Sequence, residues 1–87
     1  MLRVVSYKED DRIYDYNGIS FTHLATVYLD GKTYIAYKVL IDGSTYVEEL
    51  LQSKVSDAIF GEDQLKYIED DKIWTKIVMA LQKENII

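Results

Sequence analysis

Apolar and polar residues alternate through the first half of the chain, which is typical of strands with one buried face. The dipeptide Asn17-Gly18 separates two such segments, residues 12–16 and 19–29. A two-residue type I′ turn requires positive φ at both central positions, and Asn-Gly adopts it readily. The pattern therefore predicts a hairpin in which Tyr14 lies opposite Phe21 and Tyr16 opposite Ile19.

A second hairpin is predicted around Asp30-Gly31. Odd-numbered positions are apolar in residues 19–29 and again in residues 33–41, so the two strands bury one common face only if odd pairs with odd. This favours a three-residue loop, Leu29-Asp30-Gly31, with Gly31 in the left-handed region. The resulting pairs are Val27 with Thr33, Ala25 with Ile35 and His23 with Tyr37. An earlier strand over residues 2–7 completes an antiparallel meander.

After Gly43 the apolar positions take up a helical spacing. Thr45-x-x-Glu48 fits a capping box, and the apolar stripe behind it predicts a helix over residues 45–60. We further expect a short helical turn at 63–68 and a final helix at 71–84, capped by Asp70 or Asp71. The predicted fold class is α+β: an antiparallel three- to four-stranded meander, then two main C-terminal helices and the short turn, packed on one sheet face.

The chain has 87 residues, which suits a single domain over 1–87, with a sheet half at 1–43 and a helical half at 44–87. It has no Cys, which excludes disulfides, thiolate metal sites and a Cys nucleophile. The sequence shows no targeting segment and no membrane-spanning run. We therefore expect a cytoplasmic protein, or one of the host cytosol if it is viral.

Candidate catalytic chemistry is sparse. His23 is the only histidine and could act as a general base, but the pattern offers no nucleophile and no fixed carboxylate partner. A partly buried structural histidine bonded to a hydroxyl or carbonyl is the favoured interpretation. The carboxylate runs do not fit a calcium loop, which needs alternating ligands, a central Gly and a terminal Glu. We expect no enzyme activity, no metal and no cofactor.

Negative charge gathers in one segment. Residues 57–71 hold six carboxylates against Lys66, a net charge of −5 that equals the charge of the whole chain. Because this segment joins two predicted helices, we expect it to be exposed and to attract a basic partner. The alternative is a solvated connection whose acids only cap helices. The expected partner-binding residues are Asp57, Glu62, Asp63, Tyr67, Glu69, Asp70 and Asp71, with Tyr67 as the aromatic anchor.

These features favour a small acidic protein-binding module. We expect an inhibitor or regulator that engages a basic surface of a nucleic-acid-handling protein, because spaced carboxylates can mimic nucleic-acid phosphates. In size, charge and lack of catalytic groups the chain looks like the small acidic inhibitors that phages and toxin-bearing bacteria encode. Direct nucleic-acid binding is disfavoured, since the basic residues are scattered. The alternative is a self-associating structural or accessory subunit, a homodimer through the Tyr28/Tyr34 sheet face or a sheet edge.

Overall fold

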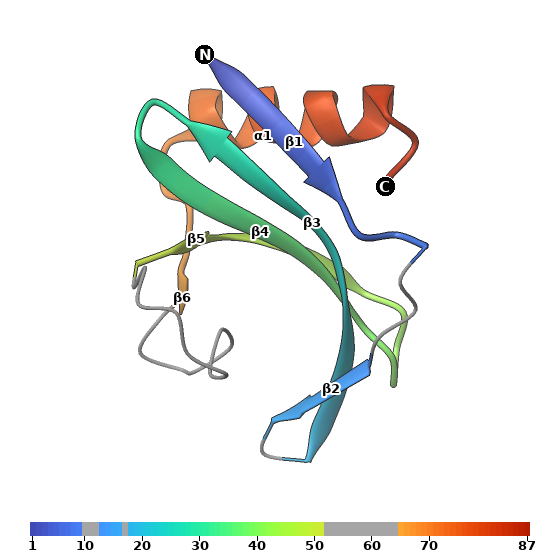
Figure 1. The fold of residues 1–87 in the computed structure, drawn as a ribbon. Helices are drawn as coiled ribbons and strands as arrows, with labels where there is room; N and C mark the ends of the chain where they lie inside the picture. Colours follow the sequence, from blue (N-terminus) through green and yellow to red (C-terminus); the bar gives the residue numbers. More distant parts are fainter. Residues whose placement is uncertain (10–12, 17, 52–64) are drawn as a thin grey trace.

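The described residues form a six-stranded antiparallel sheet with one helix packed against it (Figure 1). The structure, a computed structural model, describes residues 1–9, 13–16, 18–51 and 65–87. In chain order the elements are β1 (Leu2–Ser6), β2 (Ile13–Tyr16), β3 (Ile19–Leu29), β4 (Lys32–Val39), β5 (Thr45–Leu50), β6 (Leu65–Lys66) and α1 (Asp71–Lys83).

The long strand β3 organises the sheet. The order is β1-β3-β4-β5-β6, and β2 pairs with the other end of β3. β1 therefore does not pair with β2, as a simple meander would require, but with the C-terminal half of β3. In Figure 1, α1 lies across the end of the sheet that carries β1, whereas β2 lies at the opposite end.

The first hairpin has the predicted register. Tyr14 pairs with Phe21 and Tyr16 with Ile19. Gly18 has a φ of 79°, the left-handed conformation that this turn requires. The rings of Tyr14 and Phe21 stack with centroids 5.8 Å apart, which adds a cross-strand aromatic contact to the turn.

The predicted three-residue loop of the second hairpin is wrong. Leu29 pairs with Lys32, so Asp30-Gly31 forms a two-residue turn, and both residues have positive φ. Val27 lies opposite Tyr34 and Ala25 opposite Ala36, not Thr33 and Ile35. A β-bulge between His23 and Ala25 then shifts the register by one residue, and His23 does lie opposite Tyr37. The two-residue turn at Asp30-Gly31 shifts the pairing of the two strands by one residue relative to the register that the apolar alternation favours. The extra residue of the bulge restores the favoured register from His23 onward.

The two-residue turn also changes which tyrosines share a face. Tyr28 lies opposite Thr33, so it is on the same face as Ile35, whereas Tyr34 is on the other face. Tyr34 is buried in the core, while Tyr28 is exposed beneath the Arg3 guanidinium, 4.6 Å from its ring centroid. The expected Tyr28/Tyr34 surface therefore does not exist as one face.

The expectation of two main helices is contradicted. Residues 45–50 form strand β5 and residues 65–66 form β6, whereas residues 51, 67 and 68 are in neither a helix nor a strand. The other residues of the two predicted segments, 52–60 and 63–64, lie outside the described residues. Strands favour β-branched and aromatic residues such as Thr45, Tyr46 and Val47. β5 also pairs with the edge of β4 along six residue pairs. The final helix is confirmed as α1. Among the described residues, no helix has the length and apolar character needed to span a membrane.

Asp70 caps this helix as predicted. Its Oδ1 accepts hydrogen bonds from the backbone N–H groups of Lys72 (2.9 Å) and Ile73 (3.3 Å). These bonds satisfy two of the amide groups that have no partner inside the helix.

Apolar residues pack on both faces of the sheet. The larger cluster lies between the sheet and α1, where Ile77 and Leu81 are fully buried against Val27, Tyr34 and Ala36. The smaller cluster, around Phe21 and Ile35, is on the opposite face. This arrangement places α1 beside β5, and the candidate site lies between these two elements.

Candidate functional site

A groove of about 600 Å³ lies between strand β5 and helix α1. It is bounded by β5, by the connection from β6 to α1, by one side of α1 and by the last residue of the chain. The residues that line it are Thr45, Tyr46, Val47, Glu48, Tyr67, Ile68, Asp71, Trp74, Val78 and Ile87. Ligand sites are typically concave and apolar with a few placed polar groups, and this set has that composition.

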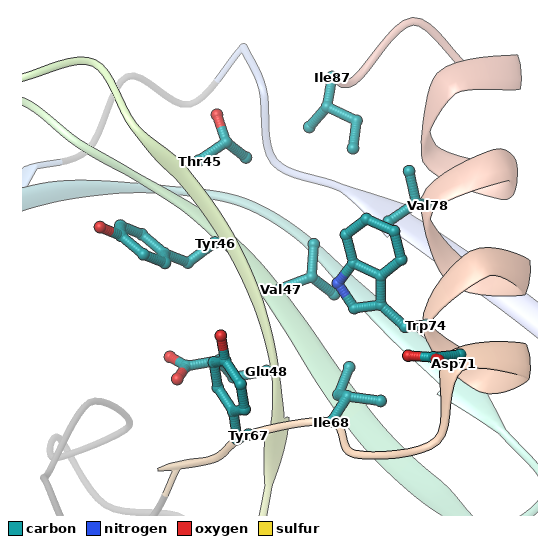
Figure 2. Close-up of a pocket in the computed structure, with 10 residues that line it drawn as sticks. All are labelled: Thr45, Tyr46, Val47, Glu48, Tyr67, Ile68, Asp71, Trp74, Val78 and Ile87. Carbon is teal, nitrogen blue, oxygen red and sulfur yellow. The ribbon is translucent and has the colours of Figure 1, made fainter.

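The two sides of β5 present different chemistry to the groove. Figure 2 shows Val47 and Trp74 pointing toward one another across the space between β5 and α1, whereas Tyr46 and Glu48 project from the other side of the strand. Side chains alternate along a strand, so this division follows from the backbone. The helix side of the groove is apolar apart from Asp71 at the start of α1, and the other side combines a carboxylate with a phenol ring.

Aromatic side chains in the groove are unusually exposed. The exposed fractions are 42% for Tyr46, 77% for Tyr67 and 46% for Trp74. Large aromatic rings gain binding energy when a partner covers them, and they are enriched in protein interfaces. These three rings therefore supply contact area that the folded chain itself leaves uncovered.

The carboxylate of Glu48 is held in place by neighbouring tyrosines. Its Oε1 accepts a hydrogen bond of 2.5 Å from the hydroxyl of Tyr37, whose ring stacks on that of Tyr46 with centroids 5.5 Å apart. Burial, together with this hydrogen bond, raises the pKa of Tyr37 above its ordinary value, so the phenol stays protonated as the donor. A charged group fixed in this way loses less conformational freedom when a partner binds.

The structure places four of the seven expected binding residues. Tyr67 and Asp71 line the groove. Glu69 is exposed on the connection before α1, outside the groove lining, and Asp70 uses its Oδ1 as the helix cap. The other three, Asp57, Glu62 and Asp63, lie outside the described residues.

Sequence reasoning missed Trp74, Tyr46 and Glu48. The sequence places Trp74 in the predicted final helix without a binding role, and it predicts residues 45–48 as the start of a helix. The usable signal was Thr-Tyr-Val at positions 45–47, a run of strand-forming residues directly after a turn containing Gly43.

Comparison with known proteins gives no relative for this chain: no family model, no curated protein and no solved structure matches it. Within the described ranges, no group of three or more His, Asp or Glu side chains is arranged to hold a metal ion.

His23 has a local structural role at the β-bulge. Its Nε2 lies 3.0 Å from the carbonyl oxygen of Ala25 and 3.1 Å from Oγ1 of Thr26. Because a carbonyl only accepts, Nε2 carries the proton and donates it to Ala25. The ring also stacks on Tyr7 with centroids 4.7 Å apart. His23 is thus partly buried and bonded to a carbonyl and a hydroxyl, as the sequence favoured.

We expect His23 to make the fold less stable in mild acid. Burial lowers its pKa below the ordinary 6.5, and the hydrogen bond to Ala25 opposes this only in part. The unfolded chain therefore binds a proton on this residue before the folded chain does, and the free energy of unfolding decreases as the pH falls through and below about 6.5. Urea unfolding of the wild type and of His23→Gln, measured from neutral to mildly acidic pH, checks this.

The comparison between the two proteins isolates the histidine, because all other titratable groups are the same in both. The wild type should lose more stability than His23→Gln over the interval. Parallel pH profiles for the two proteins would contradict the assignment.

Proposed function

We propose that the protein is an acidic protein-binding module whose groove between β5 and α1 engages a basic segment of a partner, as an inhibitor or regulator. The observation that carries this proposal is the combination, in one groove, of the exposed rings of Tyr46, Tyr67 and Trp74 with the carboxylates of Glu48 and Asp71. Aromatic anchors supply affinity, and charges of one sign select a partner of the opposite sign.

A nucleic-acid-handling protein is the partner class that we propose. Such proteins present basic surfaces for phosphates, and a chain with a net charge of −5 is attracted to them. Glu69 and Asp70 extend the negative charge beyond the groove along the connection to α1. Partner and nucleic acid would then compete for one basic surface, which is the basis of the proposed inhibition.

The test compares two variants of equal net charge. Glu48→Gln with Asp71→Asn removes both groove carboxylates, while Glu9→Gln with Asp15→Asn removes two exposed carboxylates that do not line the groove. Each protein is immobilised, exposed to lysate at low and high salt, and the bound proteins are identified by mass spectrometry. We expect the wild type and the control to capture the same basic nucleic-acid-handling protein at low salt and to release it at high salt.

The groove variant should bind that partner about five- to thirtyfold more weakly, the effect of losing two exposed charge pairs of about 0.5–1 kcal/mol each. Equal weakening in the control variant would contradict the groove as the site. Recovery of the protein alone at both salt concentrations would instead favour self-association and overturn the proposal.

A further inference from the structure

We infer that the occupant of the groove is an extended segment of the partner that pairs with β5 as an additional strand and alternates apolar with basic side chains. This inference rests on the proposed function, since it specifies how the same groove recognises its partner. Strand addition to an open sheet edge is an established mode of peptide recognition, in which backbone hydrogen bonds supply affinity and alternate pockets supply specificity.

One edge of β5 is open over its first four residues. β5 pairs with β4 along its whole length, but β6 covers its other edge only at Glu49 and Leu50. Within the described part of the chain, no residue pairs with residues 45–48 on that side. The open edge is about 13 Å long at roughly 3.3 Å per residue, which suits an added strand of about four paired residues.

The backbone groups that face this edge can be assigned. The N–H of Val39 donates to the carbonyl of Ser44, so the carbonyl of Ser44 points toward β4. Hydrogen-bonding direction alternates along an antiparallel strand, and therefore Tyr46 and Glu48 also bond toward β4. The N–H and C=O groups of Thr45 and Val47 then point away from β4, toward the groove.

The lining of the groove agrees with a site beyond the strand edge. Four consecutive residues, 45–48, contribute to it. A cavity over one face of a sheet would be lined by alternate residues, because neighbouring side chains point to opposite faces. Consecutive lining residues indicate that the space lies beside the strand, where an added strand would run.

The surroundings specify alternating side chains in the occupant. On the α1 side, an added strand would meet Trp74, Val78 and Ile87, so apolar side chains fit there, and Asp71 lies at the start of the helix. On the other side it would meet Tyr46 and the fixed carboxylate of Glu48, which favour Lys or Arg.

Charge also decides against a second copy of this chain as the occupant. Antiparallel pairing of two β5 strands about Val47 would place Tyr46 of each copy opposite Glu48 of the other, which leaves the two Glu48 side chains as diagonal neighbours on one face. Like charges at such positions are destabilising, whereas a basic segment neutralises them. The occupant is therefore a basic segment of a different protein.

The probe is the acetylated and amidated hexapeptide Val-Lys-Val-Arg-Val-Lys, carrying fluorescein and followed by anisotropy. The control peptide Val-Glu-Val-Glu-Val-Glu keeps the alternation but reverses the charge. The control peptide Val-Val-Val-Lys-Arg-Lys keeps the composition of the probe but removes the alternation. Single N-methyl groups are then placed at each position of the basic peptide in turn. We expect binding of the alternating basic peptide only, and a loss of about tenfold or more on N-methylation at every second position, because alternate amides face β5.

A pair of protein variants tests the backbone hydrogen bonds between β5 and the peptide by changing β5 instead of the peptide. Thr45→Pro removes an outward N–H at the first residue of a strand, where proline is tolerated, and Thr45→Ala keeps that N–H. We expect about tenfold weaker peptide binding for Thr45→Pro and little change for Thr45→Ala. Amide exchange at Val47 in the wild type should slow when the peptide is bound.

The outcomes separate the inference from the proposed function. Binding that Glu48→Gln with Asp71→Asn weakens, but that N-methylation leaves unchanged at every position, overturns strand addition and leaves the acidic module intact. Strand addition is likewise overturned, and the acidic module is left intact, if the peptide does not bind while the lysate partner is still captured through the groove. If binding of the peptide and binding of a lysate partner are both independent of the groove, strand addition and the proposed function are both overturned.

Discussion

Ile77→Ala is expected to lower the free energy of unfolding by about 2–5 kcal/mol. Ile77 is fully buried between α1 and the sheet, in the cluster that includes Val27 and Tyr34. The substitution removes three carbons and leaves a space that the surrounding strands can close only in part. Domains of this size have total stabilities of about 5–15 kcal/mol, so the loss is a large share.

Met79→Ala is the matched control for this core substitution. It truncates an apolar side chain on the same helix, but Met79 is 62% exposed, and we expect a change within about 0.5 kcal/mol. Urea unfolding followed by circular dichroism measures both variants. A loss for Ile77→Ala no greater than that for Met79→Ala would show that α1 does not pack on the sheet as described.

The parts of the fold that the sequence predicts correctly depend on local chemistry. Asn17-Gly18 specifies its own turn type and hence the pairing of Tyr14 with Phe21. Asp70 begins α1 because a short carboxylate side chain reaches the free amides of the first turn. Both features involve residues only a few positions apart, so the sequence contains nearly all the information they need.

The incorrect predictions concern choices that distant residues decide. The segment beginning at Thr45 fits a helix cap and a helical apolar stripe, yet it also contains strand-forming residues, and short runs of this kind are ambiguous. The unpaired edge of β4 favours the strand, which no local pattern reveals. The bulge at His23 likewise depends on the turn at Asp30-Gly31 and on the face that Tyr37 must occupy.

The candidate site is partly predictable for the same reason. The acidic segment before α1 is visible in the sequence, and two of the residues proposed from it, Tyr67 and Asp71, line the groove. The open edge of β5 is a property of the sheet order, which depends on pairings between distant segments. The exposure of Trp74 could not be predicted either, because the apolar stripe of α1 is wider than the surface that the sheet covers.

Trp74→Ala is expected to weaken binding of the alternating basic hexapeptide, and of the natural partner, by about thirtyfold or more. Tryptophans at the centre of an interface commonly contribute about 2 kcal/mol or more on truncation. Trp74 stands between β5 and α1, where it faces Val47, and almost half of its surface is still accessible to a partner. Since it is only half-buried, the free energy of unfolding should change far less than in Ile77→Ala.

The chain offers a direct readout of this contact, because Trp74 is its single tryptophan. An added strand would exclude water from the indole, so its emission should shift to shorter wavelength as the peptide is titrated. Met79→Ala again serves as the control, since Met79 lies on α1 but does not line the groove, and it should bind the peptide like the wild type. If the peptide binds without moving the tryptophan emission, and Trp74→Ala binds it equally well, the binding surface lies elsewhere. If Thr45→Pro abolishes the shift in tryptophan emission, the peptide must contact both the edge of β5 and helix α1. The substitution acts at the strand, whereas the emission reports on Trp74 in the helix.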